Sequence, residues 1–195
     1  IYPLPGTTYD GWVKELSGMM PIKKLKINVY PCLILPNAEL NDKSYKKRFK
    51  MKTKTIPFNV DMEECEIITS MESMSYEDVV KGWMFVWIVK NFWFEPILRY
   101  IYYEYFKADV KIKDFFVKFQ DFLENNPTST TGILYNRLKN NIHNTYDDYD
   151  QVVDHNYCIG YFREHVNLVL KDFEKFIYKY FNRSIDNLGV GYAMQ

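Results

Sequence analysis

The sequence predicts an α+β fold that is mainly α-helical, with five to six helices and a small N-terminal antiparallel β-sheet or hairpin. Two observations predict this class. From residue 75 onward, apolar residues recur at steps of three and four, which is helical spacing. Within residues 24–35 and 44–60, positions 24–29 and 49–55 instead alternate with period two, which is typical of strands.

The chain is expected to form a single domain. Its 195 residues are 47% hydrophobic and contain no linker rich in Gly, Ser or Pro, so they can bury one substantial core. The expected parts are an N-terminal arm with a short helix, a small β-region, a helical core and a C-terminal arm, at residues 1–21, 22–69, 75–182 and 184–195.

The first residues are predicted to be extended, because Pro3 and Pro5 prevent a helix. A short helix over residues 9–20 follows. Such an arm packs on its own core or reaches a neighbouring molecule, and both alternatives remain open. Strands are expected at 24–35, where Pro31 marks a bulge or an edge, at 44–60, and at 66–69.

Residues 75–123 carry most of the apolar surface, and they begin with a predicted capping box between Ser75 and Asp78. Charged residues leave no uncharged run longer than 82–89, which is too short for a membrane span. We therefore expect a buried core helix here, with its tryptophans in the core.

The rest of the chain is expected to be helical. Pro96 ends the core helix or begins the next one, which carries tyrosines on several faces, and Asp109 is expected to cap a third. A helix at 128–142 and one long helix at about 150–181 complete the core.

The charge is unevenly distributed. The net charge is zero, but residues 1–60 hold eleven Lys and Arg against four Asp and Glu, whereas residues 61–195 hold fourteen against twenty-one. This asymmetry fits head-to-tail association of identical chains, an anionic partner for the basic part, or neutralisation within the fold.

The basic strand at residues 43–54 is the candidate for contact with nucleic acid or another anion. Its lysines would follow a phosphate backbone while Tyr45 and Phe49 stack on bases. The alternative is that lysines on an edge strand prevent edge-to-edge aggregation. The candidate contacts are Lys43, Lys46, Lys47, Arg48, Lys50, Lys52 and Lys54.

No enzyme signature is present, and no cofactor, catalytic residue or metal site is predicted. One cluster has metal-ligand residue types, but its spacing matches no established pattern, and acidic residues are common at helix N-termini. It comprises Asp147, Asp150, Asp154, His155, Cys158, Glu164 and His165. A hydrolase or metal enzyme using His155, Cys158 and His165 is retained as a third alternative.

We expect a non-enzymatic structural protein that self-assembles through its arms and tyrosine-rich contacts, as a viral capsid, matrix or crystal-forming occlusion protein does. Its 17 tyrosines and zero net charge suit dense packing between copies. The residue usage favours AT-rich codons, which are found in several groups of genomes, many insect viruses among them. Three unpaired cysteines indicate a reducing, intracellular compartment. The candidate assembly contacts are Tyr2, Tyr9, Trp12 and Tyr192; the alternative function is nucleic-acid binding or regulation.

Overall fold

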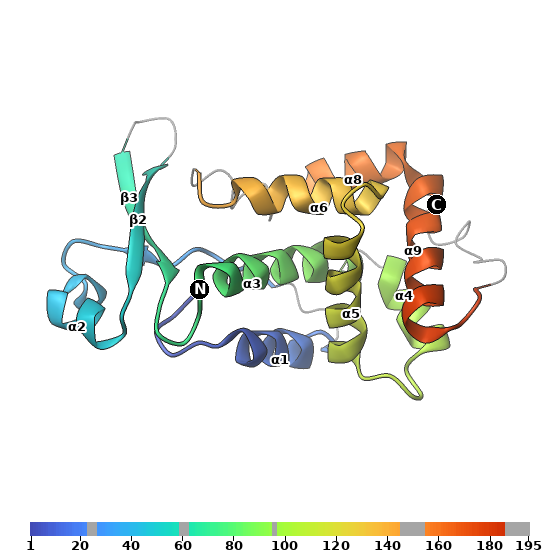
Figure 1. Ribbon diagram of the computed structural model, residues 1–195, viewed down its shortest axis with the longest axis horizontal. Helices are drawn as coiled ribbons and strands as arrows, with labels where there is room; N and C mark the ends of the chain where they lie inside the picture. The colour runs from blue at the N-terminus through green and yellow to red at the C-terminus, as the bar shows by residue number, and fades with distance from the viewer. Residues whose placement is uncertain (23–26, 59–62, 95–96, 145–154, 186–195) are drawn as a thin grey trace. The chain divides into compact units, whose positions relative to one another are not determined.

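The computed structural model describes residues 1–22, 27–58, 63–94, 97–144 and 155–185. It confirms a mainly helical α+β fold, which is 60% helical and carries a small three-stranded antiparallel sheet (Figure 1). The predicted number of helices is wrong, because the described residues alone form eight α-helices.

The elements have the following bounds. The helices are α1 (Tyr9–Met19), α2 (Lys43–Arg48), α3 (Tyr76–Ile88), α4 (Ile97–Tyr105), α5 (Ile112–Asn125), α6 (Thr130–Asn141), α8 (His155–Glu164) and α9 (Val166–Phe181). The strands are β1 (Leu33–Ile34), β2 (Lys52–Phe58) and β3 (Glu63–Ser70). A 3-10 turn, η1 (Glu39–Asn41), precedes α2, and a π-helix, η2 (Val89–Phe94), continues α3.

The chain divides into two compact units. Unit 1 comprises Ile1–Trp87 and Leu138–Val153, and unit 2 comprises Ile88–Arg137 and Asp154–Gln195. The chain passes from one unit to the other in the last turn of α3 and again within α6. A single domain stays a prediction.

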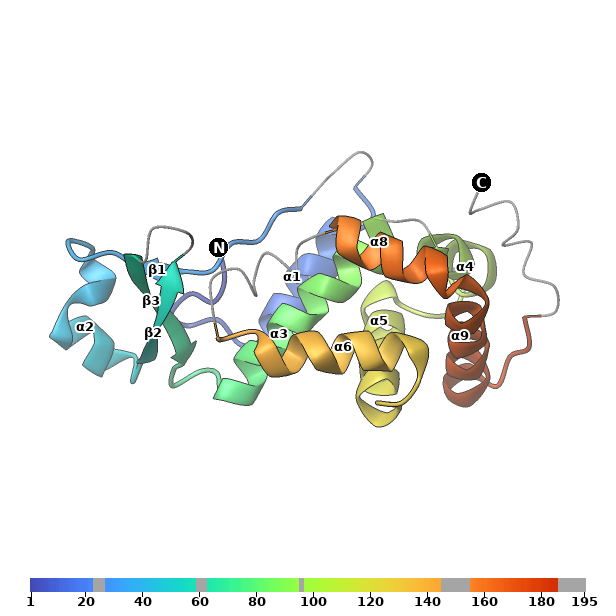
Figure 2. The same cartoon turned by 90° about the horizontal axis from the view of Figure 1, so that it is seen from above.

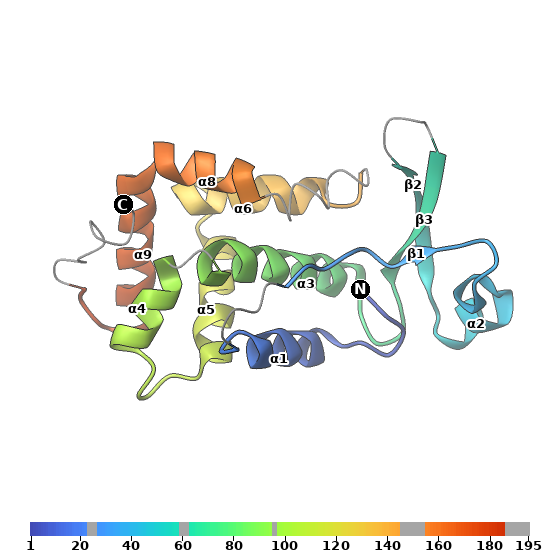
Figure 3. The ribbon, with the colours of Figure 1, turned by 180° about the vertical axis from the view of Figure 1, so that it is seen from behind.

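The sheet of unit 1 has the strand order β1-β3-β2, with both pairings antiparallel. The register places Ile67 of β3 opposite Leu33 of β1 and Lys54 of β2. The sheet and α2 form one end of this unit (Figure 3). A small antiparallel sheet is therefore confirmed, but within the predicted strand at 24–35 only Leu33–Ile34 forms β1, and residues 23–26 lie outside the described residues.

The predicted strand over 44–60 is wrong in its first part, where α2 forms instead. Lys and Arg are good helix formers, and the Tyr45 and Phe49 rings, four residues apart, pack with centroids 4.8 Å apart. A Schellman motif ends α2, because the Lys50 amide donates to the Lys47 carbonyl and the Met51 amide to the Lys46 carbonyl. Lys50 adopts the left-handed conformation at φ 47°, and β2 begins at Lys52.

The predicted start of α3 is confirmed. The Asp78 amide donates to the Ser75 hydroxyl at 3.1 Å, and the Ser75 amide donates to the Asp78 carboxylate at 3.3 Å, which is a reciprocal capping box. Helix α1 runs alongside α3 (Figures 1 and 3). The Trp12 indole on α1 donates to the Gly82 carbonyl on α3 at 3.3 Å. Trp83 and Trp87 are fully buried, as predicted.

Unit 2 is built on phenylalanine rings from α5 and α9, which run side by side (Figures 1 and 2). Phe176 of α9 lies 5.0 Å from Phe119 and 5.3 Å from Phe115 of α5, measured between ring centroids. Both pairs are edge-to-face, the arrangement that the quadrupole of the rings favours. The apolar stripe predicted for α5 is therefore confirmed as core.

The predicted long helix over about 150–181 is wrong, because it breaks at His165 into α8 and α9. His165 has φ −117° and ψ 21°, and its carbonyl accepts from the amides of Leu168 and Val169 at the start of α9. Its ring stacks on Tyr161 with centroids 4.5 Å apart. Residues 150–154 lie outside the described residues.

Across the described ranges, none of the helices has the length and apolar character needed to cross a bilayer.

Candidate anion-binding and assembly surfaces

The seven cations predicted to share one basic strand lie on three different elements. Four are on α2, Lys50 is in the turn that follows it, and the other two are on β2. These residues therefore do not form one continuous strand. Three of the side chains bond to other residues of unit 1, and four do not form an ion pair among the described residues.

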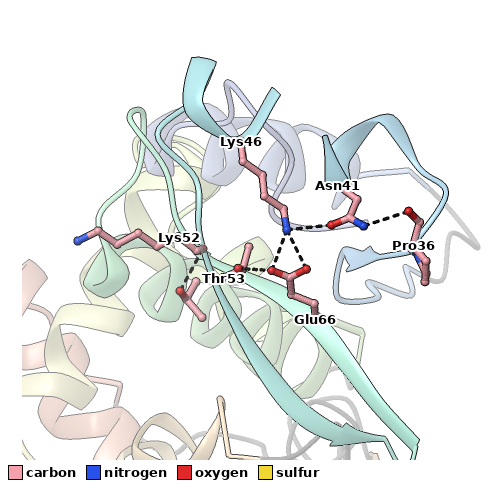
Figure 4. Close-up of polar contacts among 7 residues, drawn as sticks. Pro36, Asn41, Lys46, Lys52, Thr53 and Glu66 are labelled. Atoms are coloured by element: carbon pink, nitrogen blue, oxygen red, sulfur yellow. Dashed lines mark hydrogen bonds and ion pairs between the residues drawn. The ribbon is translucent and has the colours of Figure 1, made fainter. Parts of the chain in front are cut away.

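Lys46 is the centre of the internally bonded group (Figure 4). Its ammonium nitrogen Nζ lies 2.8 Å and 2.9 Å from the two carboxylate oxygens of Glu66 on β3. It also donates to Asn41 Oδ1 at 3.0 Å, and Asn41 Nδ2 donates to the Pro36 carbonyl at 3.0 Å. Lys46 therefore fastens α2 to the sheet and to the turn before it.

Glu66 completes this cluster from the sheet side. Burial raises the pKa of its carboxyl group, but hydrogen bonds from Lys46 and Thr53 and the charge of Lys46 lower it by more, so its pKa lies below the usual value. Glu66 is thus held ionised and paired. Because the ionised Glu66 carboxylate occupies the Lys46 ammonium group, Lys46 is not available to an external anion.

Lys50 and Lys54 are also bonded within unit 1. The Lys50 ammonium lies 2.5 Å from a Glu72 carboxylate oxygen, at an exposed position. The Lys54 ammonium donates to the backbone carbonyl of His143 at 2.8 Å. This contact joins β2 to the turn that follows α6. Burial, together with the Lys54 charge, lowers the pKa of the buried His143 to about 4.

The remaining four cations, Lys43, Lys47, Arg48 and Lys52, are exposed. In the part of the chain that the structure describes, no carboxylate forms an ion pair with them. The Arg48 guanidinium lies 5.2 Å from the centroid of the Phe49 ring, and the Lys52 side chain points away from the Glu66 cluster in Figure 4. We call these four residues the exposed basic set.

The predicted assembly contacts lie mostly inside unit 1. Tyr2 is 0% exposed and Trp12 is 8% exposed, so the structure shows the arm packed on its own core. Tyr9 is half-buried and its ring lies 5.1 Å from the Lys81 ammonium. Tyr192 lies outside the described residues. The role of these residues in assembly stays a prediction.

A tyrosine-bearing face on α4 was not among the predicted contacts. Tyr100 is 55% exposed, and Tyr103 and Tyr105 are each 40% exposed. Arg99 lies 5.7 Å from the Tyr100 ring centroid, and Lys107 lies 5.3 Å from that of Tyr103. The signal in the sequence is the three-residue step from Tyr100 to Tyr103, which places these two rings on one face of α4.

The residues weighed as metal ligands do not come together among the described residues. No group of three or more His, Cys, Asp and Glu side chains in residues 1–22, 27–58, 63–94, 97–144 and 155–185 is placed to hold a metal ion. Asp147, Asp150 and Asp154 lie outside these ranges. Cys158 is fully buried on α8, and His165 Nδ1 lies 2.9 Å from the Tyr161 carbonyl.

Comparison of the sequence with protein-family models and with curated proteins gives no match.

Proposed function

We propose that this protein is a non-enzymatic structural protein that self-assembles, of the kind found in viral capsids, matrices or crystalline occlusions. The observation that carries the proposal is the set of exposed tyrosines on α4: Tyr100 and Tyr103 share one helix face, Tyr105 lies on another, and all three large rings are left exposed by their own chain. Tyrosine is enriched in protein interfaces because it brings a large contact area and a hydroxyl group at a small loss of conformational entropy.

Two further features support contacts between copies. Tyr103 rests on the buried Trp93, with ring centroids 5.5 Å apart, so this tyrosine is held in place before a partner binds. Preorganised contacts lose less entropy on association. Tyr178 on α9 is also exposed, at 67%. The zero net charge removes the long-range repulsion that would oppose dense packing.

Light scattering on a sizing column, with absorbance recorded at nucleic-acid and protein wavelengths, tests the proposal. We expect wild-type protein to form particles that grow with concentration and are free of nucleic acid. A Tyr100→Ser/Tyr103→Ser variant should need at least a tenfold higher protein concentration than the wild type to form particles. Lys175→Ser, at an exposed position on α9, is the matched control. A wild-type chain that stays monomeric at all concentrations would overturn the proposal.

The second candidate is a nucleic-acid-binding or regulatory protein, which the exposed basic set favours. Lys43, Lys47 and Lys52 have no described carboxylate partner and are available to phosphates. Replacing these three lysines with Glu should abolish binding of a labelled single-stranded oligonucleotide. Lys175→Glu is the control, because it reverses a charge on a different helix. Equal binding by wild-type and triple-variant protein would exclude this candidate.

A further inference from the structure

Helix α2 is attached to the rest of unit 1 by polar contacts. None of its six residues is buried. The half-buried ring of Tyr45 packs on that of Phe49, the residue that ends the same helix. An isolated helix of this length is unstable in water, because its few hydrogen bonds do not repay the cost of nucleation. The helical state of residues 43–48 therefore depends on contacts with other elements.

Lys46 makes the contacts that attach the helix. Among the described residues, it is the α2 residue whose side chain forms hydrogen bonds outside the helix, to Glu66 on β3 and to Asn41 in η1 (Figure 4). The side chains of Lys46 and Glu66 are 23% and 28% exposed, so water screens this pair less than a pair on the open surface. On a helix with no buried residue, the pair is the main interaction that holds the helix on the sheet.

The Glu66 carboxylate accepts hydrogen bonds from two elements. Lys46 donates from α2, and the Thr53 hydroxyl group donates from β2. Burial raises the pKa of Glu66, but these bonds and the Lys46 charge outweigh it, so the pKa lies below its ordinary value. The carboxylate is therefore charged at neutral pH and holds α2 through Lys46. The attachment weakens as the pH falls and the carboxylate takes up a proton.

A second ion pair of this segment lies in water. The side chains of Lys50 and Glu72 are 71% and 58% exposed. Exposed pairs contribute little to stability, because water screens the charges and both side chains lose conformational freedom. The Glu72 amide also donates to the Phe49 carbonyl at 2.8 Å. This backbone bond fixes the chain directly after α2, and separation of Lys46 from Glu66 leaves it intact.

We propose that α2 is a releasable helix: when Lys46 and Glu66 separate, residues 43–48 leave the sheet and lose their helical structure. The sheet persists, because β2 and β3 pair with each other over their whole length without α2. Separation also frees the Lys46 ammonium group, so the exposed basic set of four cations gains a fifth. Release of α2 therefore raises the affinity of this surface for polyanions.

Hydrogen exchange of backbone amides measures the release. Glu66→Gln, studied at neutral pH, removes the negative charge and keeps the shape of the side chain. The amides of Lys46, Phe49 and Met51 are bonded within α2 and the turn that ends it. We expect their exchange to become about tenfold faster or more in this variant, while exchange in β3 stays the same. Glu72→Gln is the matched control and should change neither. Equal exchange in wild-type and Glu66→Gln protein overturns the proposal.

Binding of a labelled DNA duplex provides a second measurement, which rests on the second candidate function. The slope of log affinity against log salt should become steeper by about 0.9 in Glu66→Gln protein, because one more lysine contacts phosphate. Lys46→Met also releases the helix but supplies no cation, so its slope should equal that of the wild type. Faster exchange with an unchanged slope in Glu66→Gln protein overturns the gain of a fifth contact. If wild-type protein does not bind the duplex, the nucleic-acid candidate fails, and the exchange rates alone support or overturn the release.

Discussion

The Asp172 carboxylate of α9 accepts hydrogen bonds from both the backbone amide of Thr131, at 2.8 Å, and its hydroxyl group, at 2.9 Å. Thr131 lies in the first turn of α6, where backbone amides have no partner within the helix. A buried aspartate from one helix therefore caps another, with its negative charge at the positive end of the helix dipole.

Asp172→Asn should lower the free energy of unfolding by about 1–3 kcal/mol, because both donors bond to the same carboxylate oxygen, Oδ2, and the substitution removes the negative charge that strengthens these buried hydrogen bonds. Urea unfolding at neutral pH measures this change. Glu174→Gln, at an exposed position on the same helix, should change stability by no more than about 0.5 kcal/mol. Equal effects of the two variants would contradict the assignment of Asp172 as a cap.

His143 makes stability depend on mild acid. Its pKa of about 4 in the folded chain lies below the ordinary 6.5, so between these values the unfolded chain binds a proton that the folded chain does not. Protonation of His143 therefore leaves the free energy of unfolding unchanged above pH 6.5 and lowers it by about 3 kcal/mol as the pH drops to 4. His143→Gln should flatten this part of the stability profile. Parallel profiles for wild-type and His143→Gln protein would refute the prediction.

Lys46 and Lys47 are neighbours on α2 with different expected roles. Lys46→Met should lower the free energy of unfolding by about 1–2 kcal/mol at pH 7, because Lys46 pairs with the partly buried Glu66. Lys47→Met should be nearly neutral, since Lys47 is exposed. The lowered pKa of Glu66 means that its stabilisation is present above the ordinary carboxyl pKa and is lost as the pH falls. The difference between the two variants should therefore shrink in acid; a constant difference would count against the pair.

Tyr180 should titrate at strongly alkaline pH. Burial, followed by the hydrogen bond to the Asp121 carboxylate and the charge of that carboxylate, raises the pKa of Tyr180 to about 12. The folded chain keeps a proton that the unfolded chain loses near pH 10, so this stabilisation is lost as the pH rises from 10 to 12. Tyrosine ionisation can be followed by absorbance as the pH is raised. Tyr180→Phe should remove the ionisation step near pH 12, and Asp121→Asn should move that step to lower pH. Tyr178→Phe is the control, and an unchanged curve in Asp121→Asn protein would contradict this account.

Local signals in the sequence were sufficient for several elements. The capping box of Ser75 and Asp78 depends on residues three apart, and the structure forms it as predicted. The apolar stripe of α5 likewise follows from spacing alone, and Phe115 and Phe119 are buried as expected. Such features need no knowledge of distant residues.

Other elements depend on contacts that a local pattern does not encode. The alternation at residues 49–55 led to a predicted strand that extended back to residue 44. The Tyr45–Phe49 contact and the ion pair of Lys46 with Glu66, twenty residues away, instead favour a helix over residues 43–48. The break at His165 has no Gly or Pro to announce it. Tyr2 packs against Trp12 of α1 and donates to the Val79 carbonyl of α3, and these contacts between distant residues are visible only in three dimensions.

Lys46, Lys50 and Lys54 are bonded within unit 1, so they are not counted as phosphate contacts. Salt should therefore weaken a complex with nucleic acid less than seven contacts would predict. Each phosphate contact releases condensed counterions, and the slope of log affinity against log salt is about −0.9 per contact on duplex DNA. The exposed basic set offers Lys43, Lys47, Arg48 and Lys52, so binding through this set alone gives a slope no steeper than about −3.6. A steeper slope would place further phosphate contacts elsewhere in the chain.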